Sequence, residues 1–295
     1  MVLIVAASIL VFLIIRLIPG DPVVMMLGSS AADTKLIDQV RHQLGFDLPI
    51  YQQYFIWAGG ILHGNFGTSV FNNMPVTTLM RLNYPSTLQL TVAALAVSVV
   101  FGLSLGTIAA VKQDSFWDVG LRTIALVGLA MPSFWLGLLL ISFFGVTLRW
   151  LPVFGGTGWR AVILPALSLG IGGGSIIARF VRSNLLETIR LQHVTVARSK
   201  GVTAFGVLSK HVLRNALLPI ITVIGLQVGG LLSGTVVIEE VFSRPGIGNL
   251  LINAILDKDY PTVQLVILVF TVVFALVNLI VDMLYPVLDP RIRYS

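Results

Sequence analysis

The sequence predicts an all-α integral membrane protein with six transmembrane helices. Of its 295 residues, 56% are hydrophobic and only 11% are charged, with a mean hydropathy of +0.93, values outside those of a soluble domain. Five uncharged runs can each cross roughly 30 Å of hydrocarbon at about 1.5 Å per residue. They cover residues 86–111, 123–148, 161–178, 215–238 and 262–281.

A sixth apolar run begins at Met1. It is uncharged as far as Ile15 and ends at Arg16, whose long side chain can extend to the lipid head groups. A cleaved secretory signal is the alternative, but no basic region precedes this run and no small-residue cleavage site follows it. We therefore expect residues 1–18 to form an uncleaved anchor helix.

Cations are concentrated in residues 181–216, between the fourth and fifth runs. Only one acid, Glu187, accompanies them. The cations are Arg182, Arg190, Arg198, Lys200, Lys210 and Arg214. Because lysine and arginine accumulate in cytoplasmic loops, this loop is expected to be cytoplasmic, and six spans then place both termini on the same side. The topology accounts for most of the net charge of +6, so no nucleic-acid partner is expected.

The chain is expected to divide into four parts. These are the anchor helix 1–18, an extracytoplasmic loop region 19–85, a five-helix core 86–288 and a cytoplasmic tail 289–295. In the outer region, Leu36, Val40 and Leu44 recur every four residues before Gly45, which predicts a short amphipathic helix that ends there. This helix could pack as a lid over the helix ends or contact substrate.

Small residues recur four positions apart within the apolar runs. The segments are "GLSLG" (102–106), "GIGGG" (170–174), "GLQVG" (225–229) and "GLLSG" (230–234). Such spacing lets transmembrane helices approach closely. Gln227 and Asn278 are polar groups within apolar spans. Each is a candidate for lining a transport pathway, or for a hydrogen bond to a neighbouring helix.

The sequence contains no recognisable catalytic or nucleotide-binding motif. It has no phosphate-binding loop, no cysteine and no histidine inside a predicted span, so we expect no catalytic residue, no metal site and no cofactor. If the protein is a transporter, its energy comes from elsewhere.

The basic loop is unusually long for a turn between two spans and is predicted to be helix, break, helix. Residues 181–200 lack glycine and proline, Gly201 can end a helix, and Thr203 can cap a second helix that reaches Leu218 before Pro219.

On this second helix, Phe205, Leu208 and Val212 recur at helical spacing beside a face with Lys210 and Arg214. An apolar ridge beside cations suits docking into a groove of a partner protein. It equally suits an amphipathic pair resting on anionic lipid.

The chain resembles a known family over nearly its whole length. "ARSKG" (197–201) and "HVLRNALLP" (211–219) look like the cytoplasmic coupling loop, or EAA region, of permeases in binding-protein-dependent ABC importers. The more specific likeness is to the B-type permease of dipeptide, oligopeptide and nickel importers. It extends to "IRLIPGDPV" (15–23), "GNFGTSV" (64–70), "MPSFWLGLLL" (131–140), "EEVFSRPGIGNLL" (239–251), "DYPTVQ" (259–264) and "LDPRIR" (288–293).

The sequence departs from the family pattern in two places. Thr195 and Val196 replace the Glu and first Ala of the general motif, so the contact made by that glutamate is not assigned here. The family also has basic residues before its first span, and we expect the natural chain to begin upstream of Met1.

The resemblance implies the MetI-like fold of a type I ABC importer permease and a mechanism of alternating access. It also implies a multi-pass location in the bacterial plasma (inner) membrane. This subunit would form half of the pathway and would not be an enzyme. Its expected partners are a second permease, two ATPase subunits that hydrolyse ATP, an extracytoplasmic substrate-binding protein and membrane lipid.

The resemblance also implies which residues contact the ATPase. These are Ala197, Arg198, Lys200, Gly201, Phe205, Leu208, Lys210, His211 and Arg214. Substrate is left open among dipeptide, oligopeptide, glutathione and nickel. A secondary transporter or a membrane scaffold is the alternative function, although no internal repeat is evident and no ionisable residue lies at mid-span.

Overall fold

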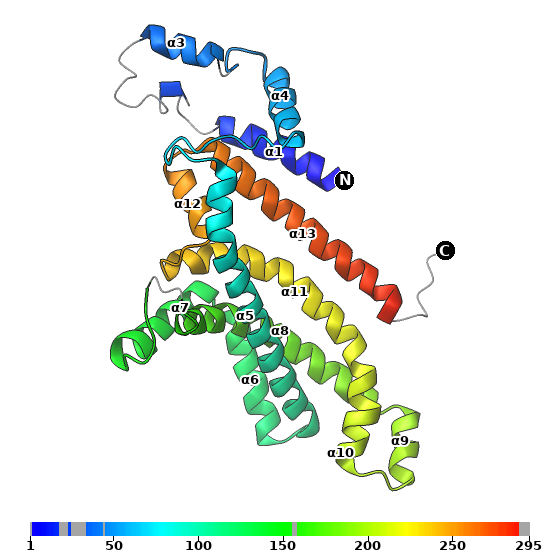
Figure 1. Cartoon of the computed structure of the whole chain (residues 1–295). Coiled ribbons are helices and arrows are strands. Elements are labelled where there is room, and N and C mark those ends of the chain that lie inside the picture. The colour runs from blue at the N-terminus through cyan, green and yellow to red at the C-terminus, as the bar shows by residue number, and fades with distance from the viewer. Residues whose placement is uncertain (1, 18–22, 25–33, 44, 155–157, 289–295) are drawn as a thin grey trace. The chain divides into compact units, whose positions relative to one another are not determined.

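A computed structural model of the chain describes residues 2–17, 23–24, 34–43, 45–154 and 158–288. In these ranges the regular secondary structure is helical, with turns and loops between the helices, and the β pairing is limited to one isolated antiparallel bridge between Thr68 and Pro75. The helices are α1 (Val2–Leu17), α3 (Thr34–Gln43), α4 (Ile50–Leu62), α5 (Val76–Val111), α6 (Phe116–Ala130), α7 (Ser133–Leu140), the π-helix η2 (Ile141–Thr147), α8 (Arg160–Ile189), α9 (Gln192–Ser199), α10 (Ala204–Gly206), the π-helix η3 (Val207–Leu213), α11 (Arg214–Val241), α12 (Ile247–Leu256) and α13 (Tyr260–Leu288) (Figure 1).

Four described helices are long and apolar enough to cross a membrane: Val76–Val111, Arg160–Ile189, Pro219–Val241 and Tyr260–Val281. A fifth crossing requires α6 and α7–η2 to act together, although they are bent by 106°. Helix α1 has 16 residues, or about 24 Å, which is short of the hydrocarbon thickness. The described helices thus confirm a multi-pass protein, while the count of six stays a prediction.

The expected span 123–148 is broken near its start in the structure. The helix stops at Ala130, Met131 has an extended conformation (ψ 124°), and a new helix begins after Pro132. Proline disfavours the helical conformation of the residue before it, so the "MP" dipeptide is the cause of this break.

The described residues form two compact units. The first contains Met1–Pro85 and Pro245–Ala275, and the second contains Ser86–Arg244 and Leu276–Ser295, so α5 and α13 each contribute to both. The predicted division into anchor, outer region, core and tail is a functional one and stays a prediction.

Aromatic packing joins α1 to α4 in the first unit. The Phe12 ring lies 5.3 Å from that of Tyr54 and 5.6 Å from that of Trp57. The predicted outer helix is confirmed as α3. Gly45 follows it with φ +69°, and the Phe46 N–H donates to the Arg41 carbonyl at 2.9 Å, an arrangement that ends helices. The side chains of Leu36, Val40 and Leu44 lie outside the described residues.

Helix α8 is at the centre of the second unit. Its first half packs with α5, η2 and α11 around Leu90, Leu164 and Ile238, and its second half joins another cluster around Ile177 and Ile220. Figure 1 shows α8 and α11 extending together toward α9 and α10. Both clusters therefore depend on the position of α8.

Glycines set the distance between α8 and α5, as the four-residue spacing predicted. A Cβ on Gly170 would lie 2.7 Å from the Ala94 carbonyl oxygen, and one on Gly102 would lie 2.8 Å from that of Gly174. Real Cβ atoms do not approach so closely, so these positions admit only glycine without a shift of the backbone.

The packing of α5 on α8 predicts a strong effect of Gly170→Ala. We expect the free energy of unfolding to fall by about 1–3 kcal/mol, because the added methyl overpacks a helix contact. The matched control is Gly120→Ala in α6, where a Cβ meets nothing within 4 Å. Thermal unfolding of the purified variants in detergent measures the difference, and equal midpoints would contradict this view of the α5–α8 contact.

Candidate functional site

The basic loop is the candidate site that the sequence singles out, and its first break lies earlier than expected. Helix α8 ends at Ile189, and Leu191 is extended (φ −70°, ψ 145°) before α9. The sequence gives no glycine or proline signal at this point. Residues 181–200 are therefore two helices and not the single one predicted.

The second break confirms the prediction for Gly201. This residue has φ +78°, and its N–H donates to the Arg198 carbonyl at 2.9 Å. The hydroxyl of Thr203 then accepts from the Gly206 N–H at 3.2 Å, as a helix cap does. Left-handed backbone strongly favours glycine, so the turn depends on residue 201.

The helix after this turn does not stop at Leu218 as predicted. Helical backbone is continuous from Ala204 to Val241, and Pro219 lies inside α11. Proline is tolerated in membrane helices where the freed carbonyl is satisfied by local adjustment. The loop is thus joined to a membrane-spanning helix without a break.

Most apolar side chains of the loop pack inward. Val194, Ala197, Val207 and Val212 are each at most 6% exposed. They form one cluster with residues of α8 and α11, including Val181, Leu185, Ala216 and Ile220. The loop is therefore held against the helices that it connects.

The predicted ridge of Phe205, Leu208 and Val212 is wrong. Val212 is buried, Leu208 packs against the same inner cluster, and only Phe205 is largely exposed, at 79%. The π-helix η3 covers residues 207–213. Its turns contain more residues than those of an α-helix, so three- and four-residue spacing no longer places these side chains on one face.

The exposed surface of the loop combines cations with apolar groups. Arg198, Lys200 and Lys210 are exposed, as are Val202 and Phe205. Of the predicted site, Arg198, Lys200, Gly201, Phe205 and Lys210 are therefore exposed. Ala197 and Leu208 pack inward instead, and the side chains of His211 and Arg214 lie outside the described residues.

The two pathway candidates are on different helices. The Gln227 side chain donates from Nε2 to the Gly173 carbonyl at 3.0 Å. This is the hydrogen bond to a neighbouring helix that was the alternative to lining a pathway. Asn278 is half-buried on α13. The structure therefore gives Gln227 a packing role between α11 and α8.

A buried carboxylate that the sequence did not single out joins α6 to α8. Asp118 is fully buried, and Arg182 donates to it from Nε at 2.8 Å and from Nη2 at 2.7 Å. Arg122 lies 3.3 Å away, and the Asp114 N–H donates at 3.1 Å. Arg182, counted above among the loop cations, thus belongs to a bidentate ion pair within the helix bundle.

The "EEVFSR" segment contributes a second buried polar group. Glu239 accepts from the Thr87 hydroxyl at 2.6 Å, and Arg244 donates to the Gln89 side chain at 2.8 Å. Burial lowers the pKa of the Arg244 guanidinium, while the charge of Glu239 acts in the opposite direction. This segment therefore fastens the end of α11 to α5.

Two further matched segments meet in the first unit. Asp259, which precedes α13, accepts hydrogen bonds from the Ser69 hydroxyl, from the Val70 N–H at 3.2 Å and from the Thr262 hydroxyl at 2.8 Å. Hydrogen bonds to Asp259 thus hold the segments "GNFGTSV" and "DYPTVQ" together. No signal in a single sequence pairs residues 190 positions apart.

Family models match both parts of the chain. The model described as "Binding-protein-dependent transport system inner membrane component" matches residues 102–294. A second, described as "Binding-prot-dependent transport system membrane comp, N-term", matches residues 1–91.

Full-length relatives agree with these models. The glutathione transport system permease protein GsiC of Escherichia coli strain K12 is 42% identical over 288 residues, which are 98% of this chain and 94% of the relative. GsiC of Salmonella choleraesuis strain SC-B67 has the same identity and coverage.

Solved structures share the fold. An inward-facing conformation of the MetNI methionine ABC transporter matches with a TM-score of 0.60 at 20% identity, over 73% of this chain and 98% of that one. A crystal structure of an amino acid ABC transporter with histidines matches with a TM-score of 0.57 at 16% identity, over 71% and 94%. The predicted MetI-like fold is therefore confirmed.

These matches exclude the alternatives of a secondary transporter and a membrane scaffold. A binding-protein-dependent ABC system contains an ATPase and a substrate-binding protein besides its membrane components. The chain belongs to the family of binding-protein-dependent transport system inner membrane components, as a multi-pass, non-enzymatic permease subunit of an ABC importer in the bacterial inner membrane.

Proposed function

We propose that residues 181–216 dock onto an ATPase subunit and transmit its movement to the membrane helices, so that the permease alternates between outward-open and inward-open states. The observation that carries this proposal is the division of the loop into two faces. Val194 and Val212 are buried against α8 and α11, while Phe205 is 79% exposed. An apolar side chain among cations is the kind of anchor that a groove in a partner accepts.

The same division argues against a loop that rests on lipid. A membrane-surface helix inserts its apolar face into the head-group region. Here most apolar side chains of α9 and η3, among them Val194, Ala197 and Val212, are packed in the protein's own core, while Val196 is 46% exposed. The apolar side chains that stay exposed are scattered among cations and do not form one continuous face, which suits a protein partner better than a lipid surface.

Helix continuity supports the transmission of movement. From Ala204 the helical backbone continues through η3 and α11 to Val241, and α9 is packed against the same cluster through Val194 and Ala197. Displacement of a rigid element at one end is carried to its other end. The loop and the cytoplasmic part of α11 are therefore suited to move together.

We further propose that the chain forms half of the pathway, beside a second, different permease subunit and above two ATPase subunits. Asn278 on α13 and Gln227 on α11 remain the pathway candidates. Gln227 is the weaker of the two, because its amide already donates to α8.

The proposed substrate is a peptide or a peptide-like solute such as glutathione. Support comes from the relatives named as glutathione permeases, which match along 98% of this chain. Oligopeptides and nickel chelates stay open as alternatives.

Both termini are proposed to be cytoplasmic, since the cations of residues 181–216 orient the chain. A cytoplasmic reporter fused after Ser295 should be active, and a periplasmic reporter at the same place inactive. Fusions to chains truncated after Phe71 should show the opposite pattern. Periplasmic activity after Ser295 would contradict the proposed orientation.

The docking proposal predicts that Gly201→Val impairs both ATPase co-purification and glutathione uptake. The left-handed turn is strained by a β-branched residue, and the altered turn displaces Phe205. Membrane insertion depends on the apolar spans and should be unchanged, so variants are compared at equal membrane abundance.

Gly64→Val is the matched control for this experiment. Gly64 has φ +79°, and a Cβ there meets nothing within 4 Å, as at Gly201 (φ +78°). The two substitutions therefore both place a β-branched residue in left-handed backbone at nearly the same φ, but only Gly201 lies in the proposed docking loop. Equal co-purification of the ATPase with Gly201→Val and wild type would refute the proposal.

A further inference from the structure

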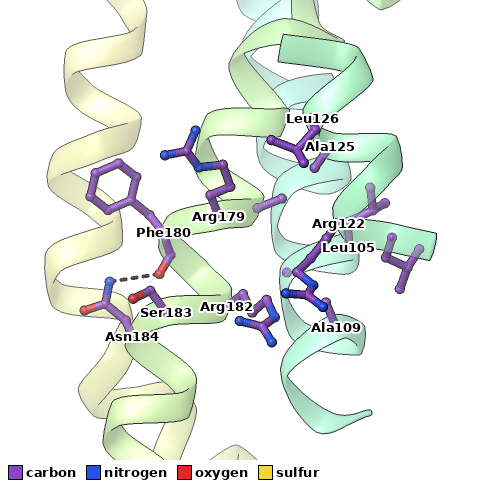
Figure 2. Close-up of a pocket in the computed structure, with 13 residues that line it drawn as sticks. Leu105, Ala109, Arg122, Ala125, Leu126, Arg179, Phe180, Arg182, Ser183 and Asn184 are labelled. Carbon is purple, nitrogen blue, oxygen red and sulfur yellow. Dashed lines mark hydrogen bonds between the residues drawn. The ribbon is translucent and has the colours of Figure 1, made fainter. Parts of the chain in front are cut away.

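A pocket of about 500 Å³ lies between α5, α6 and α8. Leu105 and Ala109 of α5 and Leu126 of α6 form an apolar wall, and the basic lining comes from Arg122 of α6 and from Arg179 and Arg182 of α8. Figure 2 shows Arg122 and Arg182 close together between α6 and α8, with Arg179 farther along α8 on the side of Phe180. The pocket thus combines three arginines with an apolar wall.

The charges of these arginines are only partly balanced. Asp118 accepts from Arg182 and lies 3.3 Å from Arg122, and Asp114 also attracts Arg182. Arg179 makes no hydrogen bond or ion pair with any residue in the part of the chain that the structure describes. The pocket is therefore suited to an additional anion near Arg179.

Position along the helices fixes the kind of anion. Arg122 is six residues from the start of α6 and Arg182 is seven from the end of α8, or about 9–11 Å of helix. Phe116 and Trp117, at the start of α6, are exposed at 87% and 65%, as is typical of aromatic side chains at a membrane interface. The pocket therefore lies where lipid head groups meet acyl chains.

We propose that this pocket binds an anionic phospholipid. The phosphate would be held by Arg179, because guanidinium groups match phosphate geometry and no acid among the described residues pairs with this one. The part of an acyl chain nearest the head group would lie along Leu105 and Leu126. A free phosphate would leave this apolar wall exposed to water, so the geometry favours a lipid.

Bound lipid would add a second link between α6 and α8 beside the Asp118–Arg182 pair. It would contact the half of α8 that carries Val181 and Leu185, which pack against the loop. The anionic lipid content of the membrane would thereby influence how rigidly this half of α8 is held against the loop. This inference concerns a different surface from the docking face and does not depend on that face.

The test compares the binding of phosphatidylglycerol and phosphatidylcholine to the full chain purified in mild detergent, by native mass spectrometry. We expect the wild type to retain phosphatidylglycerol preferentially. The Arg179→Ala variant should bind phosphatidylglycerol about fivefold more weakly than the wild type, which is the effect of one arginine near a membrane surface. Arg179→Lys keeps the charge and should retain most of the binding. Arg160→Ala, at the opposite end of α8, is the matched control and should bind as the wild type does.

Three outcomes would overturn the proposal. The first is equal retention of the two lipids, or equal phosphatidylglycerol binding by Arg179→Ala and Arg160→Ala. The second is displacement of the bound lipid by excess inorganic phosphate, which would make a free anion the ligand. The third is loss of a co-purifying membrane protein from Arg179→Ala while its lipid binding is unchanged, which would assign the pocket to a protein interface.

Discussion

The close approach of α5 and α8 is the constraint on which the second unit depends. Gly170 and Gly102 let the two backbones meet where a Cβ would lie 2.7–2.8 Å from a carbonyl oxygen. Between helices in lipid, packing of this kind replaces the hydrophobic driving force that is available in water. With α8 fixed in this way, its two halves organise separate clusters, one toward η2 and α11 and one toward the basic loop.

The inner cluster gives the loop its mechanical properties. Val194 and Ala197 of α9 and Val212 of η3 are buried with Leu185 of α8 and Ile220 of α11. A basic segment between two spans could be a flexible tether, but this one is packed along its length. The proposed transmission of movement to α11 rests on this packing and on the helix that continues from Ala204 to Val241.

Local signals in the sequence predicted the features that depend on neighbouring residues. Glycines four apart identified helix faces that allow close contact, although not the helix they contact, and Gly201 identified the left-handed turn, because the residue type at a single position carries each signal. Pro132 carried a readable signal as well, since the residue before proline avoids helical backbone. The prediction of a span over residues 123–148 did not use this signal.

Features that depend on distant residues or on helix type could not be predicted. The Asp118–Arg182 pair joins residues 64 positions apart, and Asp259 meets Ser69 across 190. The outward ridge was wrong because its periodicity assumed an α-helix, whereas η3 is a π-helix that rotates Val212 inward.

Site-specific cross-linking from position 205 tests the central claim most directly. The chain has no cysteine, so Phe205→Cys can be labelled alone with a photoreactive maleimide in the intact complex. Phe71→Cys is the control, because Phe71 is also exposed, at 67%, in the proposed extracytoplasmic region. The account predicts that irradiation joins position 205, and not position 71, to an ATPase subunit. Cross-links from position 205 to lipid alone would contradict it.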